Sequence, residues 1–471
     1  MINYFPKYFT DRAIFLYFIL LITISVAFSH PMIWYWWLFG AAEVAGFFYF
    51  SNVFTKAWQG YYGKALEKKF FSTALLLRVF YVLFSYAFYT LLTGNPFEFS
   101  AADARFYDDM GRWGAEELWA GTFNWNRIFG DIDIDISDCG YPFYLMLIYA
   151  ITGKSLLVVR LLKAVISSFT VVLVYRLATR NFGEDVGRIS GIFCLLMPNL
   201  IYYCGLHLKE TEMLFLTILF IERADYIFRC RKINVKDLIF LFLIGAAAFF
   251  FRAVLCYVLF LTLVASVVLG SKRIKRGGKW AIEGLLLVML AVFGYFQVGS
   301  ETIFNAEEYQ NIQGQQTAAM QWRSERSGGN SYAKYASASL FAPLIFTIPF
   351  PTMVNIEYQQ NQQMIHGGNF VKNITSFFTI LALFLLLFSG EWRDNIVPLA
   401  FLIGYLIVLS FSNFAQSERF HIPALPFELI LASYAVVHFK SKFKNWFTIW
   451  LVLIFVANVG WAWFKLRGRG M

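Results

Sequence analysis

Three aspartates near the start of one polar segment are the residues in this chain best placed to do chemistry. Asp103, Asp108 and Asp109 fall within residues 94–140, a segment that holds ten Asp and Glu residues against three Arg. A carboxylate beside a low-dielectric surface holds a proton more tightly and can act as a general base. We therefore take Asp103 as a candidate catalytic base, and Asp108 and Asp109 as candidate substrate contacts.

The same aspartates also have a structural interpretation, which the sequence leaves open. The four residues that end at Asp103 resemble a helix-capping box with Asp in place of Glu or Gln. Asp108 and Asp109 stand three or four residues from Arg105 and Arg112, which is the spacing of ion pairs on a helix. On this interpretation the first aspartate caps a helix and the other two stabilise its surface.

The local pattern predicts how this segment folds. A helix that begins near Ser100 would carry Phe106, Met110 and Trp113 on one apolar face, lying on the membrane surface or against a helical bundle. Further along, three aspartates alternate with isoleucine and predict a short extended segment with its carboxylates on one side: Asp131, Asp133 and Asp135. That spacing could hold a divalent cation structurally, since carboxylate oxygens are hard ligands.

A second set of ionisable residues lies where one apolar stretch ends and the next begins, at His207, Lys209, Glu210 and Glu212. Ionisable groups at membrane depth are costly and are functional by default. The structural alternative is that Lys209 anchors the chain at the interface and that a glutamate favours the N-terminus of the following helix. We take Glu210 as a second candidate catalytic carboxylate and Lys209 as a candidate substrate contact.

Two arginines could complete an anion site. Arg252 interrupts an apolar stretch and has no acidic neighbour in the sequence, while Arg419 and His421 precede another apolar stretch. A guanidinium binds phosphate oxygens in a bidentate manner. Arg252, Arg419 and Lys209 would together suit a phosphate or pyrophosphate that arrives from the lipid, although a lone Arg can also simply extend to the interface.

The elements that must position these residues are membrane spans. Apolar residues make up 59% of the chain and charged residues 15%, a composition that excludes an ordinary soluble domain. We predict an all-α polytopic membrane protein with about 13 spans, within a range of 11 to 14. The predicted spans are 13–29, 32–54, 70–93, 158–178, 187–205, 211–228, 237–251, 253–270, 280–298, 370–389, 396–411, 421–439 and 445–464.

Segments between the spans follow from length and charge. The apolar piece 141–151 is too short to span and is predicted to be a re-entrant or interfacial helix, and 237–270 can form a hairpin with Arg252 at its tip. Lys and Arg are concentrated in alternate loops, which by the positive-inside rule lie in the cytoplasm. The basic residues behind the net charge of +10 therefore indicate which loops are cytoplasmic, and they do not indicate a nucleic-acid partner. The predicted number of spans places the basic C-terminal tail on the extracytoplasmic side of the membrane. Five cysteines lack the spacing of a disulfide framework or of a zinc site.

The order of several short patterns resembles the integral-membrane glycosyltransferases of the GT-C class, notably the protein O-mannosyltransferase and lipid A aminoarabinose-transferase relatives. The resemblance covers about 70–460 in matching order, and no single motif in it is specific. The patterns are Asp103-Ala-Arg-Phe-Tyr107, Gly140-Tyr141-Pro142, Arg160, Arg176 to Arg180 with Phe182-Gly183, Pro198 to Tyr203, and Glu418-Arg419-Phe420 with Pro423 and Pro426. The first two spans look like an N-terminal addition.

What the resemblance implies is an inverting transfer of a sugar from a polyprenyl-phosphate donor to an acceptor, with protein, lipid and glycan acceptors all left open. In the family an acidic residue of the first outer loop activates the acceptor, and Asp103 occupies that position. Glu210 corresponds best to the second acidic residue, although its neighbourhood departs from the family pattern. Basic residues that hold the lipid phosphate correspond to Arg252 and Arg419, with His421 and Tyr141 as further substrate contacts. Some members of the family need a divalent cation and others do not.

The resemblance also implies an organisation and a location. We predict an N-terminal hairpin (1–69), a GT-C-like catalytic core that includes the first outer loop 94–140 (70–298), a second outer loop region (299–369) and C-terminal spans (370–471). Juxtamembrane helices would lie in the two outer regions, and the active site of an enzyme in a bacterial inner membrane would face outward. A lipid-linked polysaccharide polymerase or ligase, a transporter or lipid flippase, and a receptor or structural membrane protein remain as alternatives.

Overall fold

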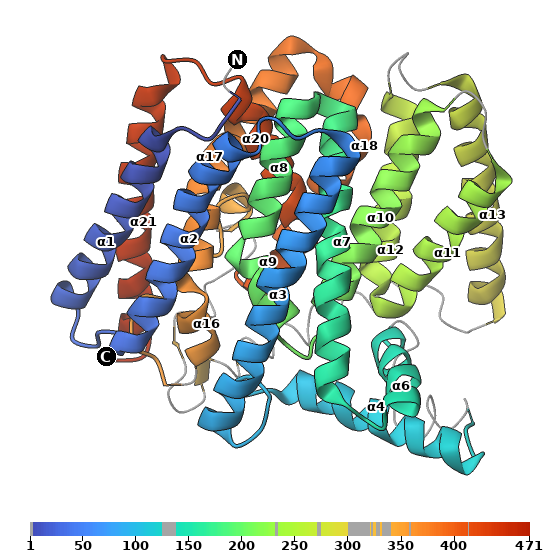
Figure 1. Cartoon of the computed structure of the whole chain (residues 1–471), viewed down its shortest axis with the longest axis horizontal. Coiled ribbons are helices and arrows are strands. Elements are labelled where there is room, and N and C mark those ends of the chain that lie inside the picture. Colours follow the sequence, from blue (N-terminus) through green and yellow to red (C-terminus); the bar gives the residue numbers. More distant parts are fainter. Residues whose placement is uncertain are drawn as a thin grey trace.

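The structure is a computed structural model that describes residues 3–124, 138–230, 234–270, 275–299, 321, 324–325, 330–331, 341–357, 359–412 and 414–471, with side chains as far as residue 289 in the fourth range. Throughout these residues the regular structure is helical, apart from one backbone bridge between Pro31 and Val354. The predicted class is therefore confirmed, and the chain is an all-α polytopic membrane protein (Figure 1).

Long helices form the bundle: α1 (Lys7–Ala27), α2 (Trp34–Ala57), α3 (Gly63–Thr93), α7 (Leu156–Phe182), α10 (Glu210–Arg229), α11 (Val235–Phe251), α12 (Ala253–Leu269), α13 (Arg276–Gly299), α17 (His366–Ser389), α18 (Ile396–Ser410), α20 (Leu425–Val437) and α21 (Phe443–Arg467). A further pair, α8 (Glu184–Leu196) and α9 (Pro198–Cys204), is bent by 49°. Pro198, the first residue of α9, causes this bend because it has no backbone N–H to continue the hydrogen bonding of α8. Among the described residues six helices are long and apolar enough to cross a membrane, or seven with the bent pair. The count of about 13 spans stays a prediction.

The faces of α3 show how a bundle helix meets both protein and lipid. One stripe is buried against the bundle and includes Phe70, Ala74 and Arg78. On the other side Leu76 and Phe80 are 73% and 69% exposed. Large apolar side chains at such exposure suit a lipid-facing surface, since a soluble monomer rarely exposes a continuous apolar face.

Four further helices gather at one end of the bundle, which we call the site end. They are α4 (Ala102–Ala120), α6 (Gly140–Thr152), α16 (Gln360–Met364) and α19 (Glu418–His421), and a 3₁₀ turn, η2 (Ala342–Leu344), precedes α16 in the chain. Figure 1 shows α4 lying across this end with α6 beside it, and the C-terminus at the same end. The predicted helix at 141–151 is thus confirmed as α6. Lys465 of the basic tail is buried and donates to Gln359 and Gln362, at 2.8 and 2.9 Å.

The start and the packing of α4 bear on two predictions. The N-cap residue is Ala101 with no side-chain cap, so the predicted capping box does not form. The face buried against the protein carries Tyr107, Asp108 and Gly111, whereas Phe106 is 46% exposed, so the predicted apolar face does not pack against the bundle, and its contact with the membrane surface stays a prediction. The reason is close approach: a Cβ on Gly111 would lie 2.6 Å from the Cβ of Leu145, so small residues must face α6.

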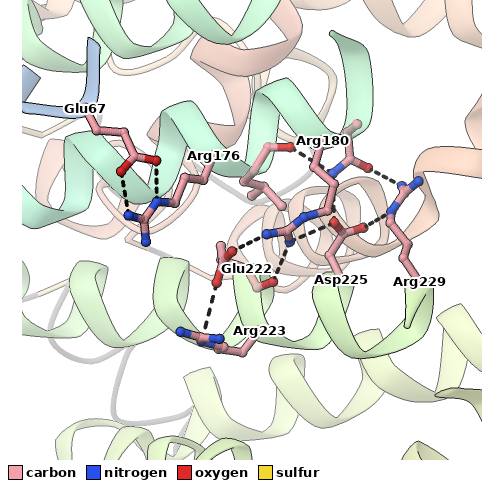
Figure 2. A network of polar contacts seen from close by, with 9 residues as sticks. Glu67, Arg176, Arg180, Glu222, Arg223, Asp225 and Arg229 are labelled. Atoms are coloured by element: carbon pink, nitrogen blue, oxygen red, sulfur yellow. Dashed lines mark hydrogen bonds and ion pairs between the residues drawn. The ribbon is translucent and has the colours of Figure 1, made fainter. Parts of the chain in front are cut away.

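The opposite end of the bundle is closed by a network of charged side chains (Figure 2). Near the C-terminal end of α7, Arg180 pairs with Glu222 and, at 3.2 Å, with Asp225 on α10. Arg176, one turn earlier, forms a bidentate pair with Glu67 of α3 at 2.7 and 2.6 Å. The network joins α3, α7 and α10 far from the site end. The 3₁₀ turn η3 (Glu391–Asn395) joins α17 to α18.

Candidate active site

An arginine at the site end joins the two predicted catalytic carboxylates. Arg419 of α19 donates from Nη1 to the carboxylate of Asp103 and from Nε to the carboxylate of Glu210. Asp103 lies in the first turn of α4, and Glu210 is the first residue of α10. Three elements that are distant in the sequence therefore meet at one guanidinium, as the prediction of a shared site requires.

The two carboxylates of this bridge differ in their surroundings. The side chain of Asp103 is 56% exposed, that of Arg419 is 18% exposed and that of Glu210 is 2% exposed. Burial alone would lower the pKa of Arg419, but Glu210 and Asp103 raise it well above its usual range. The arginine is therefore a fixed positive charge, Glu210 is its buried partner, and Asp103 is the partner that solvent and substrate can reach.

Lys209 and Arg252 bring two more cations to this end. Lys209 donates to the Asp138 carboxylate and, at 3.0 Å, to the carbonyl of Phe251. Burial lowers the pKa of Lys209 although Asp138 opposes the shift, and the charge of Arg252 lowers this pKa further. Arg252 therefore lies close enough to Lys209 for their charges to interact.

Arg252 occupies the break between α11 and α12, at the tip of the predicted hairpin. Its backbone is extended there, and its guanidinium lies 4.8 Å from the ring centroid of Phe420 in α19. Within the described part of the chain Arg252 has no carboxylate at ion-pair distance. Its charge is therefore held beside the Arg419 bridge by an aromatic ring and not by an acid, which leaves its donors available to an anion.

Asp108 and Asp109 do not join the Arg419 bridge. Asp108 is buried, accepts from Arg112 Nε at 2.7 Å and accepts from the Tyr149 hydroxyl of α6, so the predicted pairing along the helix is confirmed for it. His207 Nε2 lies 3.7 Å from the same carboxylate, but burial holds the pKa of His207 well below its ordinary range. The histidine is thus neutral and forms no ion pair. Asp109 is exposed on the other side of α4.

Tyr141 and His421 are both buried, in different surroundings. The ring of Tyr141 packs edge-on against Tyr107 at 5.2 Å between centroids, and its hydroxyl has no hydrogen-bond partner in the described structure. His421 has a partner at each ring nitrogen, with Lys372 Nζ at 2.7 Å and the Ala415 carbonyl at 2.8 Å. Tyr141 therefore offers a free polar atom near the candidate site, whereas His421 is fully engaged within the protein.

Sequence reasoning gave no role to a layer of buried ionisable groups near these residues. Lys163 of α7 is fully buried, donates to the Leu206 carbonyl at 2.8 Å and lies 3.5 Å from Glu212. Arg160, one turn earlier, is also fully buried, with two guanidinium nitrogens unpartnered in the described structure. Two basic residues three apart inside an apolar span were the signal that could have identified this layer.

Glu98 completes this layer from the loop before α4. Its side chain is buried, and burial raises the pKa of Glu98 although the charges of Arg160, Arg419 and Lys163 oppose the shift. Its Oε2 has no partner in the described structure. The layer beneath the candidate site thus contains a buried carboxyl group that is harder to ionise than an ordinary glutamate.

The resemblance left open whether a divalent cation binds, and the described ranges show no ligand group for one. No three His, Cys, Asp or Glu side chains in the described ranges lie close enough together to hold a metal ion. The predicted extended segment with Asp131, Asp133 and Asp135 lies outside the described residues. A cation bound there stays a prediction.

A comparison with known families gives the site its context. Residues 139–296 match the model of the family described as dolichyl-phosphate-mannose-protein mannosyltransferase. The matched part starts just before α6 and ends within α13, so it contains Tyr141, Lys209, Glu210 and Arg252 but not Asp103 or Arg419. No curated protein matches the chain at a significant level.

Proposed function

Because the chain carries a glycosyltransferase domain of the GT-C kind, we propose that it moves a sugar from a polyprenyl-phosphate-linked donor to an acceptor, with inversion at the anomeric carbon. Asp103 is the general base in this proposal. Arg419, Arg252 and Lys209 bind the donor phosphate, and Glu210 holds Arg419 in place. The acceptor is a hydroxyl or an amine on a protein, a lipid or a glycan.

The observation that carries the proposal is the bridge from Asp103 through Arg419 to Glu210. A base and an anion-binding cation must lie within one substrate length of each other for a single displacement to occur. Here they are in contact, and Arg252 lies over the neighbouring Phe420. A purely structural ion pair would not need, beside it, a further cation that has no acidic partner among the residues the structure describes.

The reaction follows from these positions. The acceptor hydroxyl or amine attacks the anomeric carbon while Asp103 takes its proton, so a bond from carbon to the acceptor forms. The bond from the anomeric carbon to the phosphate oxygen breaks, and the electron pair leaves with the polyprenyl phosphate. The cations stabilise the negative charge that grows on that oxygen. One direct displacement from the opposite face inverts the configuration.

The bridge also bears on the order in which the two substrates bind. A carboxylate bound to a guanidinium is a weak base because the ion pair favours its charged form. A donor phosphate that binds Arg419 competes for the donors that now hold Asp103, whereas Glu210, almost fully buried, keeps its partner. Donor binding thus releases the base at the moment when it is needed, and we expect the donor to bind before the acceptor.

The sidedness of the site is part of the proposal. The helix ends that carry the predicted cytoplasmic bases, such as Lys56 on α2 and Arg229 on α10, lie at the end of the bundle opposite to α4 (Figure 1). By the positive-inside rule the site end then faces outward. We propose a bacterial inner membrane in which the donor lipid enters the site from the outer leaflet.

Substitution of the base tests the proposal. Asp103→Asn should reduce turnover of a polyprenyl-phosphate sugar by about 100-fold or more in purified protein, the usual contribution of general base catalysis. Because the side chain is 56% exposed, the fold should be unaffected. Glu116→Gln is the matched control: this residue lies on the same helix, is 60% exposed and pairs with Lys154. Near-normal turnover by Asp103→Asn would remove Asp103 as the base.

The same assay separates the transferase from a transporter. Product that forms in detergent, where no second compartment exists, requires a bond to be made and not a molecule to be moved. A transporter would give no donor-dependent product under these conditions.

A further inference from the structure

Arg419 belongs to a helix that is too short to hold its own shape. α19 contains four residues, Glu418–His421, and a single helical turn is unstable in isolation because it fixes many dihedral angles for very few hydrogen bonds. The position of the guanidinium between Asp103 and Glu210 must therefore be set by contacts from other elements.

Two longer helices supply these contacts. The hydroxyl of Tyr405 in α18 donates to the Phe420 carbonyl at 2.9 Å. From the other side, Lys372 of α17 donates from Nζ to His421 Nδ1 at 2.7 Å. The last two residues of α19, Phe420 and His421, are thus each tied to a different helix.

The chemistry of the Lys372 contact fixes the state of the histidine. An ammonium can only donate, so Nδ1 of His421 must be the bare, accepting nitrogen. The proton is then on Nε2, which donates to the Ala415 carbonyl at 2.8 Å, in the segment that leads into α19. One imidazole therefore links α17 to both ends of the turn that carries Arg419.

Lys372 itself is an unusual residue for this position. It is 2% exposed, donates to the Ile348 carbonyl at 2.6 Å and lies 3.7 Å from Glu428 of α20. A buried ammonium inside an apolar bundle is costly and is functional by default. Its two hydrogen bonds and this ion pair join α17 to α19, to α20 and to the segment before α16.

We propose that Lys372 and His421 are positioning residues, which hold α19 so that Arg419 lies between its two carboxylates and can receive the donor phosphate. They touch no reacting atom. The proposal rests on the proposed function, since Arg419 matters here as a phosphate ligand. It assigns to His421 a role in orientation in place of the substrate contact predicted from the sequence.

Two substitutions of His421 separate its two nitrogens. In His421→Asn the amide oxygen occupies the place of Nδ1 and still accepts from Lys372, whereas in His421→Gln the amide reaches the place of Nε2 and this acceptor is lost. We expect His421→Gln to lower turnover and to weaken binding of a short-chain polyprenyl monophosphate, each by about 10-fold or more. His421→Asn should lose clearly less in both measurements.

The decisive measurement is coupling to Arg419. If Lys372 and His421 act through the guanidinium of Arg419, the double variant His421→Gln with Arg419→Lys should lose little more turnover and binding affinity than Arg419→Lys alone. Tyr405→Phe removes the other tie to α19 with a minimal change of shape, and it keeps the test valid if His421→Gln fails to fold. It should show the same coupling.

Thr379→Val is the matched control for these variants. Its hydroxyl donates to the Glu428 carbonyl at 3.0 Å, so it is an equally buried hydrogen bond in the same region that does not touch α19. Thr379→Val should reduce turnover and binding affinity only slightly. In the double variant, the fold-losses of Thr379→Val and Arg419→Lys should multiply, as for two independent sites.

Each outcome has a clear meaning. If the wild-type protein turns the donor over, and the losses of His421→Gln and Tyr405→Phe multiply with that of Arg419→Lys, the positioning role is refuted and the proposed function stands. If the wild-type protein neither binds the polyprenyl monophosphate nor transfers a sugar, both proposals fall.

Discussion

Replacement of Arg419 by methionine should destabilise the protein through one carboxylate only. Glu210 is 2% exposed and would lose its partner, and removal of one member of a buried ion pair typically costs about 3–5 kcal/mol. Asp103 is 56% exposed, and exposed pairs contribute about 1 kcal/mol or less. Because Arg419 is itself 18% exposed, we expect a loss near the lower end, about 3 kcal/mol in the free energy of unfolding.

A second substitution tests whether Glu210 is the cause. In the double variant Arg419→Met with Glu210→Gln no buried charge is left without a partner, so most of the stability should return. Activity should not return, because the proposed phosphate ligand is still missing. Stability and activity thus move apart in the double variant, which a general defect in folding could not produce.

The assay is unfolding by heat in one detergent, with all variants measured side by side. Arg176→Met is the matched control, since this arginine also bridges helices but is 44% exposed and pairs with a half-buried Glu67 (Figure 2). It should shift the midpoint of unfolding only slightly. The reasoning fails if Arg419→Met and Arg176→Met have the same effect, or if Glu210→Gln does not restore the stability of Arg419→Met.

Two further predictions concern the neighbours of this bridge. Arg252→Ala should weaken binding of a polyprenyl monophosphate by about 10- to 100-fold, the value of one charge-assisted hydrogen bond, and unchanged affinity would make Arg252 only an interfacial anchor. Burial raises the pKa of Glu98, so the folded state binds its proton more tightly, and stability falls as the pH rises above the ordinary carboxyl pKa. Glu98→Gln should therefore flatten the dependence of the unfolding midpoint on pH and stabilise the protein at pH 8 more than at pH 5; a parallel shift at both pH values would contradict this.

The sequence predicted the helices well because apolar periodicity and length decide them locally. The hairpin broken at Arg252 and the short helix after Gly140 both follow from such local signals. Signals at the ends of helices were weaker: the expected cap at Asp103 did not form, because its carboxylate is bound by an arginine 316 residues away. No local pattern encodes such a partner.

The residues of the candidate site could be predicted because an ionisable side chain at the end of an apolar stretch is energetically costly and therefore suggests a function. That argument singled out Glu210 and Arg419, and the structure brings both to Asp103. It gave Lys163 and Lys372 no role, because a basic residue inside a long apolar stretch does not by itself show which groups it contacts. Their roles depend on carbonyl groups and carboxylates of other helices, which only the packed bundle brings near.

The contrast between the two ends of the bundle has a mechanical consequence. At the end drawn in Figure 2, Arg176 links α7 to Glu67 of α3, and Arg180 links α7 to both Glu222 and Asp225 of α10, so the exchange of one partner leaves other links in place. At the other end, Arg419 contacts α4 through the exposed carboxylate of Asp103, and an incoming phosphate competes for that contact. We expect the charged end to stay rigid when the substrates bind, while the Asp103 end of α4 shifts against the bundle.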